Sequence, residues 1–351
     1  MNTEERMELV MNNVQEVVTE EELRDLLKRN SNPSAYIGIE PSGMMHVGQG
    51  MMCANKVKDM QEAGFHVKIL LADWHAYIND KLGGDIEAIR VCGEYIKDCF
   101  LALGVDPDRT EFVLATDMMD RITYWERVLR VAKANSVARI KRAVDIMGRD
   151  SQETEADSSM LIYPSLQVTD IFELNVDVAY AGMDQRRAHM LARDTADKLG
   201  WKKPVALHTP ILSGLKGTGR MDAANKGKMS KSDPDSCIFI HDDPKDISRK
   251  INGAYCPPEV EGNPILEMAK YIVFTSTDEL HITRPEKWGG DLHYESYEEL
   301  EKSYLNEKLH PADLKSGVAN ALSNLLKPVR DYFKEKPDNH EKVKNILESL
   351  R

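Results

Sequence analysis

The feature that most restricts how this chain can fold is a short stretch in which a strand turns sharply into a helix. Residues Tyr36-Ile37-Gly38-Ile39 favour a strand, and Pro41-Ser42-Gly43 ends it. Apolar residues then recur at helical spacing, so we expect His46 and Gly48 in the first turn of a helix. A helix N-terminus presents unpaired N–H groups to phosphate oxygens, and glycine lets a flat ring approach the backbone. The stretch suggests a nucleotide-binding turn, although α/β proteins that bind no nucleotide also contain glycine-rich turns.

Strands and helices are expected to alternate along the N-terminal part of the chain. The expected strands are 36–39, 67–72, 111–115, 176–179 and 205–209, and the expected helices are 1–30, 86–103, 122–147, 161–175 and 185–199. This alternation predicts an α/β fold with a Rossmann-like, doubly wound parallel sheet, whose ligand lies at the carboxyl ends of the strands. A helical segment is expected as an insertion between the two halves of that sheet. The sequence after Lys245 predicts a mostly α-helical C-terminal domain.

Length and composition fit two or three domains in a soluble chain, because 351 residues with 42% hydrophobic residues can bury a real core. We expect a sheet domain over 1–212 with a helical insertion at 116–162, a linker over 213–287 and a helical domain over 288–351. No apolar run reaches the length of a membrane span, and the polar start of the chain does not resemble a signal peptide.

Cysteine usage predicts a reducing compartment. The five cysteines are scattered, odd in number and without a C-x-x-C pair: Cys53, Cys92, Cys99, Cys237 and Cys256. Such spacing argues against a disulfide framework and against a structural zinc site. We therefore expect a cytoplasmic protein with no metal held by protein ligands.

The charge of the chain is uneven. The formal net charge of −12 disfavours RNA binding, yet residues 121–149 hold eight Lys or Arg against two acids, a local balance of +6. A run of this kind is usually a solvated helix face, so the charge count alone does not decide for RNA. The same segment carries more apolar residues than one helix face needs, which predicts a homodimer unless the excess packs on the parent sheet. These apolar residues are Ile122, Trp125, Val128, Leu129, Val131, Val137, Ile140, Val144, Ile146 and Met147.

A second motif, Lys228-Met229-Ser230-Lys231-Ser232, narrows the interpretation of the turn around His46 and Gly48. Alone it is an exposed basic loop, but after His46-Val47-Gly48 it completes the paired signature of class I aminoacyl-tRNA synthetases. The sequence around the two motifs resembles tyrosyl-tRNA synthetases of the archaeal and eukaryotic type from about residue 34 to about residue 333. The matching stretches are 35–43, 70–77, Tyr163-Pro164 with Gln167 and Asp170, 182–186 and 254–257. Gln49 stands where many class I enzymes have a second histidine, and its amide can still donate.

The resemblance implies a tyrosine–tRNA ligase that forms tyrosyl-adenylate from L-tyrosine and ATP, releases pyrophosphate and passes tyrosine to the terminal ribose of tRNA(Tyr). The tyrosine carboxylate is already a nucleophile at neutral pH, so the reaction needs alignment and charge stabilisation rather than a general base. We expect His46, Lys228 and Lys231 to supply both, with Mg²⁺ carried by ATP and no tightly bound cofactor. The further ATP contacts that the resemblance implies are Gly38, Glu40, Gly48, Gly182, Asp184, Met229 and Ser230.

The resemblance also implies how tyrosine is held. Tyr36 and Asp170 are expected to meet at the substrate phenol, which needs one donor and one acceptor. Tyr163, Gln167 and Gln185 would hold the amino group, and Leu70 and His75 would wall the pocket. Read from the residues alone, Tyr36 fits a strand core. Tyr163, Gln167 and Asp170 likewise fit the polar face of a core helix, since they follow at i, i+4 and i+7.

For RNA, the resemblance assigns Arg186, with Arg142 as a companion from the insertion, to the acceptor end of the tRNA. It assigns Trp288 and Asp313 to the first anticodon base, within the C-terminal helical domain. Asp313 equally suits the start of a helix after His310-Pro311, where an acid is favoured anyway.

Three alternatives compete with this interpretation. Tryptophanyl-tRNA synthetases share the fold and both signatures, but an indole offers only a donor, whereas the pair Tyr36 and Asp170 suits a phenol. A non-tRNA nucleotidyltransferase of the His-x-Gly superfamily would not need the basic insertion or a helical C-terminal domain. A non-catalytic RNA-binding relative would not need His46, Lys228 and Lys231.

Overall fold

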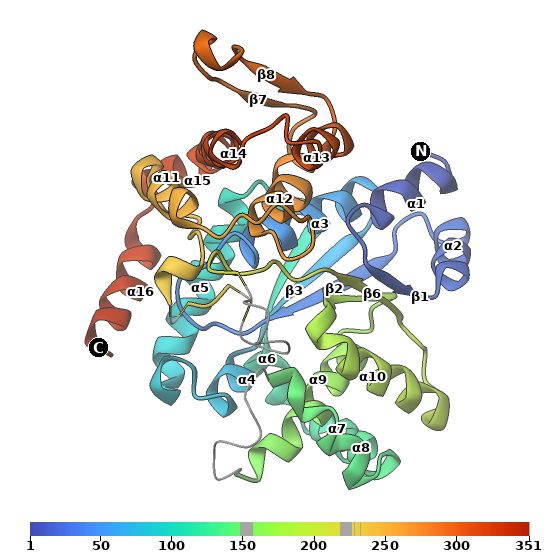
Figure 1. Ribbon diagram of the computed structural model, residues 1–351. Coiled ribbons are helices and arrows are strands. Elements are labelled where there is room, and N and C mark those ends of the chain that lie inside the picture. The colour runs from blue at the N-terminus through green and yellow to red at the C-terminus, as the bar shows by residue number, and fades with distance from the viewer. Residues whose placement is uncertain (148–156, 218–226, 228, 232, 351) are drawn as a thin grey trace.

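The centre of the molecule is a six-stranded sheet, seen in a computed structural model that describes residues 1–147, 157–217, 227, 229–231 and 233–350 (Figure 1). Its strand order is β1-β6-β5-β2-β3-β4. The strands are β1 (Glu16–Val18), β2 (Ser34–Ile39), β3 (His66–Leu71), β4 (Thr110–Leu114), β5 (Val178–Gly182) and β6 (Val205–Thr209). Five of them, β2 to β6, pair in parallel, and β1 runs antiparallel to β6 at the edge. The predicted doubly wound parallel sheet is therefore confirmed.

The connection order places a topological switch point between β2 and β5. From β2 the chain continues to β3 and β4 on one side, and later to β5 and β6 on the other side. β2 pairs along its length with β3, from Ser34↔His66 to Ile39↔Leu71, but meets β5 only at Ala35↔Val178 and Tyr36↔Ala179. Neighbouring connections leave in opposite directions at such a point, which opens a crevice at the carboxyl ends of β2 and β5.

Helices cover both faces of the sheet and continue into the C-terminal region (Figure 1). The α-helices are α1 (Thr3–Met11), α2 (Glu20–Arg29), α3 (Gly50–Glu62), α4 (Asp73–Ile78), α5 (Ile86–Ala102), α6 (Ala115–Met119), α7 (Ile122–Ala134), α8 (Val137–Lys141), α9 (Ser159–Glu173), α10 (Arg186–Leu199), α11 (Pro244–Gly253), α12 (Pro264–Met268), α13 (Tyr297–Leu305), α14 (Pro311–Leu325), α15 (Lys327–Glu335) and α16 (Asp338–Ser349). None of the helices that the structure describes has both the length and the apolar character to cross a membrane.

The sheet separates two cores because successive side chains of a strand point to opposite faces. Ala35, Ile37 and Ile39 of β2 join the core formed with α1, α3 and α5. Tyr36 points the other way and joins the core formed with α7, α9 and α10. The alternation within one strand thus places a tyrosine hydroxyl on the same side as α9, the helix that carries Asp170.

Three expectations about local structure are wrong. Residues 1–30 are not continuously helical, because α1 ends at Met11 and Val17 and Val18 pair with β6 as an edge strand. The strand expected at 176–179 begins instead at Val178, because Asp177 turns to accept the Ser34 N–H. The C-terminal region also contains a small hairpin, β7 (Leu280–Ile282) and β8 (Leu292–Tyr294), whose three-residue strands are too short for a clear periodic signal.

The helix after the first signature begins later than expected. α3 starts at Gly50, so His46 and Gly48 lie in the turn before it and not in its first turn. The cause is a long-range pairing: the Val47 N–H donates to Ile238 O (2.8 Å) and the Ile240 N–H donates to Met45 O (3.0 Å). This pairing holds His46 in a β-bridge with Phe239, which a helix cannot include.

Candidate active site

Two adjoining cavities open at the crevice predicted by the strand order. The carboxylate cavity, of about 550 Å³, includes Tyr36, Leu70, His75, Tyr163 and Asp170 in its wall. The loop cavity, of about 520 Å³, is lined by residues of the 42–49, 209–212 and 229–231 segments. Ser42, Gln49, Gly182, Asp184 and Ser230 line both cavities, so the two form one continuous cleft.

Asp170 is the buried centre of the carboxylate cavity, with a relative exposure of 1%. One of its oxygens, Oδ1, accepts the Tyr124 hydroxyl at 2.6 Å. The other, Oδ2, lies 3.2 Å from His75 Nε2 and has no other polar partner among the described residues. Burial opposes protonation of His75, but the neighbouring carboxylates, Asp170 first among them, together outweigh burial and raise the pKa of His75. A carboxylate oxygen can accept more than one hydrogen bond, so Oδ2 can also accept a ligand hydroxyl in the cavity.

Tyr36 supplies the second polar group of this cavity. It is 2% exposed, and burial followed by the nearby Asp170 charge raises the pKa of its phenol, so the hydroxyl remains protonated and can donate. Leu70, on the neighbouring strand β3, is buried beside it. The structure therefore brings the predicted pair Tyr36 and Asp170 into one cavity, from β2 and α9.

The other predicted residues of the carboxylate cavity form a chain of amides and hydroxyls. Gln167 Nε2 donates to Gln185 Oε1 (3.1 Å), and Gln185 Nε2 donates to the Ile146 carbonyl (3.0 Å). The Tyr163 hydroxyl donates to Glu40 Oε1, and its ring meets His75 edge-on at 4.9 Å. Gln167 Oε1 is buried and receives no hydrogen bond from the described residues. This oxygen is available to a donor such as an amino group.

Two glycines keep the floor of the cleft open. A Cβ on Gly48 would lie 3.3 Å from both His46 Nδ1 and Met229 Sδ, and a Cβ on Gly182 would lie 2.9 Å from Asp184 Oδ1. Gly48 thus lets the two signature segments approach each other, and Gly182 lets the Asp184 carboxylate fold across the end of β5. Gly38 lies further along β2 and lines the carboxylate cavity.

The loop cavity is lined by residues of both sequence signatures. His46 forms an isolated β-bridge with Phe239, so the first signature pairs with the segment that follows the second. Lys231 Nζ donates to Ser42 Oγ at 2.8 Å, and burial lowers the pKa of this ammonium. Met229 and Ser230 lie beside it in the cavity wall. The loop cavity thus joins a histidine, an ammonium and hydroxyls from two distant segments.

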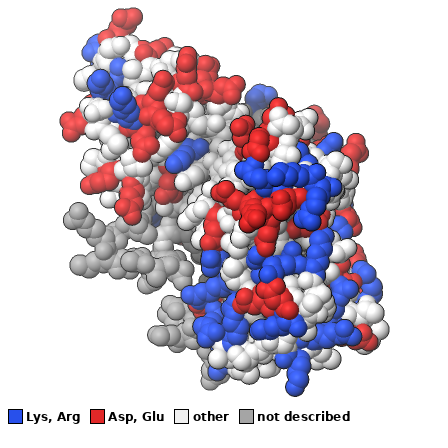
Figure 2. Space-filling view, turned by 90° about the vertical axis from the view of Figure 1, so that its right-hand side faces the viewer, with Lys and Arg blue, Asp and Glu red and all other residues white. Residues whose placement is uncertain are grey.

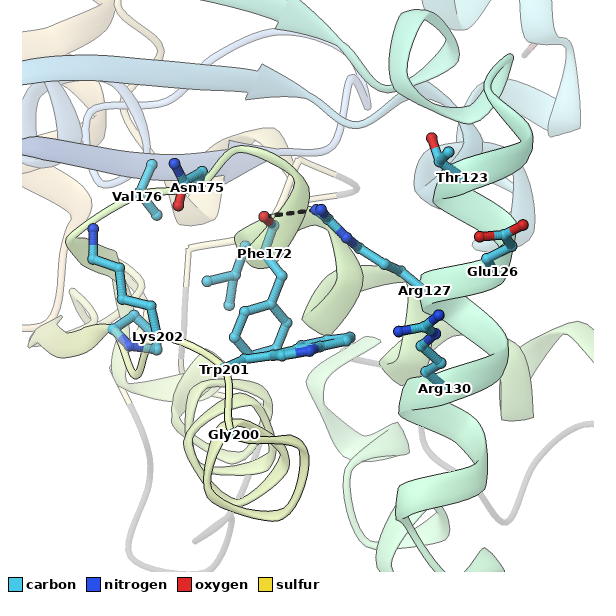
Figure 3. A pocket seen from close by; sticks show the side chains of 12 residues that line it. Thr123, Glu126, Arg127, Arg130, Phe172, Asn175, Val176, Gly200, Trp201 and Lys202 are labelled. Carbon is cyan, nitrogen blue, oxygen red and sulfur yellow. Dashed lines mark hydrogen bonds between the residues drawn. The ribbon is translucent and has the colours of Figure 1, made fainter.

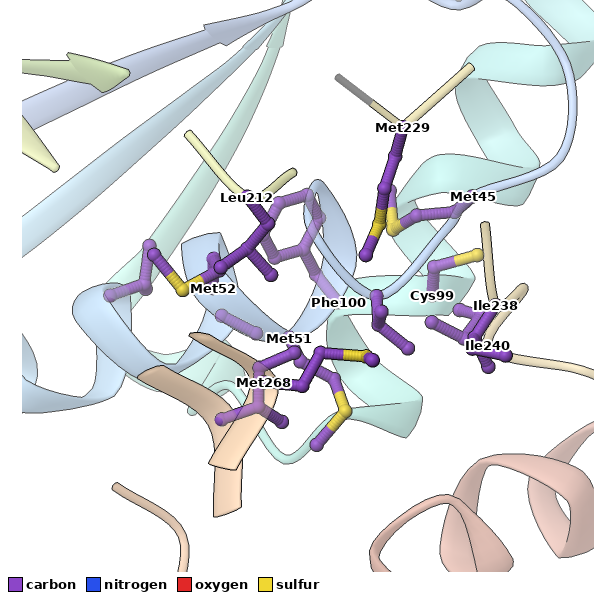
Figure 4. Packing of buried hydrophobic residues seen from close by; sticks show 14 of the residues in the cluster. Met45, Met51, Met52, Cys99, Phe100, Leu212, Met229, Ile238, Ile240 and Met268 are labelled. Carbon is purple, nitrogen blue, oxygen red and sulfur yellow. The ribbon is translucent and has the colours of Figure 1, made fainter. Parts of the chain in front are cut away.

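An apolar core rich in methionine lies behind the loop cavity (Figure 4). Met45 and Met51 come from the first signature and the start of α3, Met229 comes from the second signature, and Ile238 and Ile240 follow it. Methionine side chains are flexible and polarizable, so they maintain contact when neighbouring segments shift. This packing adds an adaptable apolar contact to the β-bridge and the Lys231–Ser42 hydrogen bond that join the two segments.

Four residues of the site were missed from the sequence. Tyr124 was assigned only to the helical insertion, yet its hydroxyl is bound to Asp170. Asn79 donates to Glu40 (3.1 Å), and Lys81 Nζ lies 3.8 Å from the same carboxylate. Ser42 holds Lys231. Ser42 was noted only as part of the turn after the first strand, and no local pattern indicates the contacts that these four residues make.

Basic residues gather on the face that carries the insertion. Figure 2 shows Lys and Arg over the lower part of this face, where Figure 1 places α7, α8 and α10. Arg142 is exposed just after α8, and its carbonyl accepts from Arg187 of α10. Arg186 Nε donates to Glu16 Oε2 at 2.7 Å, and Arg186 remains part exposed. The predicted companions Arg142 and Arg186 therefore come from segments that touch.

Trp288 and Asp313 lie at the other end of the molecule, near the β7–β8 hairpin at the top of Figure 1. Trp288 is 66% exposed in the loop between the two strands, and Asp313 is in the first turn of α14. Arg284 joins these segments, because it donates to the Gly290 carbonyl (2.6 Å) and lies 3.4 Å from Asp313 Oδ2. Lys228 and Ser232 of the second signature and Arg149 of the insertion lie outside the described residues.

Comparison with known proteins gives a consistent result. Residues 28–327 match the family model described as tRNA synthetases class I (W and Y). The chain is 49% identical to the tyrosine–tRNA ligase of Aeropyrum pernix over 94% of this chain and 93% of that protein, and 46% identical to that of Saccharolobus solfataricus over 100% and 98%. A crystal structure of tyrosyl-tRNA synthetase from Pyrococcus horikoshii, complexed with L-tyrosine, is similar with a TM-score of 0.91 and 40% identity over 98% of this chain and 100% of that chain.

Proposed function

The chain belongs to the class I tyrosyl-tRNA synthetases, and from this premise we propose which of its residues carry each step of the reaction. The enzyme activates L-tyrosine with ATP to tyrosyl-adenylate and pyrophosphate, and then transfers tyrosine to the 3′-terminal ribose of tRNA(Tyr). Both steps need a site that distinguishes tyrosine from similar amino acids, a site that stabilises charge on the phosphates, and surfaces that position the tRNA.

In this proposal, Asp170 and Tyr36 recognise the phenol of the substrate through hydrogen bonds. The observation that carries it is the buried Asp170 Oδ2, which lines the carboxylate cavity and has only His75 as a polar partner among the described residues. The phenol O–H can donate to this oxygen and accept from Tyr36. An indole N–H would satisfy Asp170 but leave the Tyr36 hydroxyl without an acceptor in the ligand, which disfavours tryptophan. Gln167, Gln185 and Tyr163 then hold the amino group, and Leu70 and His75 wall the ring.

The loop cavity stabilises the phosphates during attack of the tyrosine carboxylate on the α-phosphorus. We assign His46, Lys228 and Lys231 to charge stabilisation, because the developing negative charge lies on the departing pyrophosphate. Lys231 is supported by its place beside Ser42 in the cavity wall. Mg²⁺ arrives with ATP and bridges its phosphates, so no protein-held metal is required. Asp184 at the end of β5 is placed to accept from ribose hydroxyls, and Gly38, Glu40, Gly48, Gly182, Met229 and Ser230 complete the contact set.

The tRNA is proposed to bind at two separate surfaces. Arg186 and Arg142 contact the acceptor end, and the basic surface over α7, α8 and α10 supports this. Trp288 stacks on the first anticodon base while Asp313 accepts from its edge, supported by the exposed ring and by Arg284, which joins the two segments. Arg186 is bound to Glu16 and Asp313 lies beside Arg284, so RNA that contacts Arg186 and Asp313 would displace these partners.

The chain is proposed to divide into three parts according to these roles. Residues 1–212 form the catalytic domain, with the insertion at 116–162 serving dimer and acceptor-stem contacts. Residues 213–287 form a linker with the second signature, and residues 288–351 form the anticodon-binding domain. The five cysteines are free thiols, which supports a cytoplasmic location.

A homodimer is proposed through the exposed apolar face of the insertion. Of the residues expected there, Val128, Val131, Ile140, Ile146 and Met147 are buried within this chain and serve its own core. Ile122 (74%), Leu129 (69%), Val137 (65%) and Trp125 (41%) remain exposed. Ile122, Trp125 and Leu129 follow one face of α7, so a two-fold related copy of the same helix can cover them.

The test of the whole assignment is amino-acid-dependent pyrophosphate exchange with each of the twenty amino acids. Tyrosine should be the substrate, and tryptophan and phenylalanine should give little exchange. Exchange with tryptophan at a rate equal to that with tyrosine would contradict the assignment of the carboxylate cavity.

A further inference from the structure

A third cavity lies apart from the catalytic cleft and has no role in the reaction described above (Figure 3). This α7 cavity, of about 540 Å³, lies between α7, the carboxyl end of α9 and the segment that precedes β6. Arg127, Arg130, Phe172, Trp201 and Lys202 are the members of its wall that bear on its chemistry.

The α7 cavity and the catalytic cleft lie at opposite ends of the same strands. Val176 and Pro204, which line the α7 cavity, precede β5 and β6. Gly182 and Thr209, at the other ends of these strands, line the loop cavity. A five-residue strand spans roughly 17 Å, so a ligand in the α7 cavity does not overlap the ATP site.

Two of the three cations of the α7 cavity are already neutralised. Arg127 Nη1 donates to the Phe172 carbonyl (2.9 Å) and to Glu173 (2.7 Å). Lys202 Nζ donates to Asp177 at 2.6 Å. Arg130 is exposed and has no hydrogen bond or ion pair with any residue in the described ranges. One guanidinium on the wall is therefore available to an anion, and its planar fork suits a phosphate.

The aromatic part of the wall is formed by Trp201 and Phe172. Their rings meet edge-on, with centroids 4.8 Å apart and planes at 70°. In Figure 3 the Trp201 ring extends from the Gly200 turn toward α7, with the Phe172 ring on one side and Arg130 near its far end. The two rings do not stack on each other, and Trp201 lines the cavity, so the indole can stack with a planar ligand there.

We propose that the α7 cavity binds a nucleotide, with its phosphate at Arg130 and its base on Trp201. Glu126 also lines the cavity, and a single free guanidinium beside this carboxylate favours one phosphate over a polyphosphate. A free nucleoside monophosphate and an unpaired nucleotide of an RNA strand share this chemistry. The basic surface over α7 and α10 in Figure 2 would attract either ligand. This site lies beyond the activation and transfer of tyrosine and does not depend on the residues assigned to those steps.

The test uses the full-length enzyme with its catalytic cleft filled by a non-hydrolysable analogue of tyrosyl-adenylate. Uridine monophosphate and a hexamer of uridylate are titrated in turn, and binding is followed by tryptophan fluorescence. Arg130→Gln should weaken binding about tenfold, the loss expected for one charge-assisted contact. Lys133→Gln is the matched control, because Lys133 is exposed on the same helix and does not line the cavity. It should change the affinity less than about twofold, a screened surface charge being worth little.

Trp201→Phe provides the second measurement, since it keeps an aromatic ring but removes the indole face. It should abolish the fluorescence change and weaken binding measured by calorimetry. Binding of the monophosphate would identify a free nucleotide as a ligand, and binding of the hexamer alone would identify an RNA strand. If neither ligand binds the wild-type enzyme, or if Arg130→Gln binds as tightly as wild type, the site does not exist. That outcome would leave tyrosine-dependent pyrophosphate exchange unchanged, so it is distinguishable from a failure of the proposed function.

Discussion

The two halves of the catalytic cleft are built in different ways. The carboxylate cavity takes Tyr36 from a strand and Asp170 from a helix, and both side chains are almost fully buried. The loop cavity takes His46 and Lys231 from turns that meet through one β-bridge and a flexible methionine core. On the proposed assignment, the amino acid would be selected by side chains held on a strand and a helix, whereas the phosphates would meet side chains held on turns.

The largest expected effect concerns selectivity in the carboxylate cavity. Phenylalanine is smaller than tyrosine, so discrimination must come from polar groups left unpaired when phenylalanine binds. Tyrosyl-tRNA synthetases are themselves the standard example of this effect, and the family's discrimination is known to be about 10⁵-fold without editing. Asp170→Ala should lower the tyrosine-to-phenylalanine ratio by roughly three orders of magnitude, because a desolvated carboxylate then no longer penalises phenylalanine. Pyrophosphate exchange with both amino acids measures this ratio.

Tyr36→Phe is the matched control for Asp170→Ala. It removes a neutral group from the same cavity, so the ratio should fall by a smaller factor. A wild-type ratio in Asp170→Ala, with activity still measurable, would mean that the phenol is read elsewhere.

The second effect concerns the loop cavity. Lys231→Ala should slow tyrosyl-adenylate formation about 100-fold, since the lost ammonium stabilises charge that appears only as pyrophosphate departs. Tyrosine affinity should change little, because Lys231 does not line the carboxylate cavity. Single-turnover adenylate formation and equilibrium tyrosine binding separate the two quantities. A large loss of tyrosine affinity with unchanged adenylate formation would reverse the comparison between the halves.

A smaller effect is expected from Tyr95, which contacts the first signature and the segment that follows the second. The Tyr95 hydroxyl accepts the Met45 N–H (3.1 Å) and lies 2.7 Å from His241 Nε2, so it joins the two segments that carry the signatures. Tyr95→Phe should lower the rate of adenylate formation about tenfold through loss of this positioning, while tyrosine binding stays near wild type. Cys92→Ser, on the same helix, is a useful comparison because Cys92 Sγ accepts the Gly43 N–H, within the first of these segments. A uniform loss in stability without a change in the rate would assign Tyr95 a purely structural role.

The smallest effect concerns the pH dependence of stability, to which His241, after the second signature, and His75, in the carboxylate cavity, contribute with opposite sign. Burial, with the neighbouring His340, lowers the pKa of His241 to about 3, below the value of about 6.5 in the unfolded chain. The unfolded state therefore binds the proton first, and stability is lost as pH falls below about 6.5, by about 1 kcal/mol per pH unit. The pKa of His75 is raised beside Asp170, so its contribution is present at low pH and is lost as pH rises through the folded pKa.

Urea denaturation between about pH 7 and about pH 5 measures both contributions. His241→Gln should flatten the loss of stability on acidification, and His75→Gln should steepen it. The same change of slope in both variants would show that the two halves do not differ in this respect.

The fold and the two signatures followed from the sequence because they depend on local pattern. The alternation of apolar strands and helices predicted the parallel sheet, and the motifs around His46 and Lys231 predicted the phosphate-binding half. The N-terminal edge strand was missed because it has no such local pattern. Only its pairing with β6 distinguishes Glu16–Val18 from a break between helices. Local propensity is weak evidence where a long-range ladder supplies the hydrogen bonds.

The class of fold, the family and most of the candidate residues can be predicted from the sequence. The contacts of these residues cannot: Asp170 accepts the Tyr124 hydroxyl with one oxygen and lines the cavity with the other, and His46 forms a bridge with Phe239. The shared cavity of Arg130 and Trp201 is likewise visible only in the folded chain. These facts join residues that are far apart in the chain, and their geometry is set by packing between elements, for which a linear pattern carries no distance or direction.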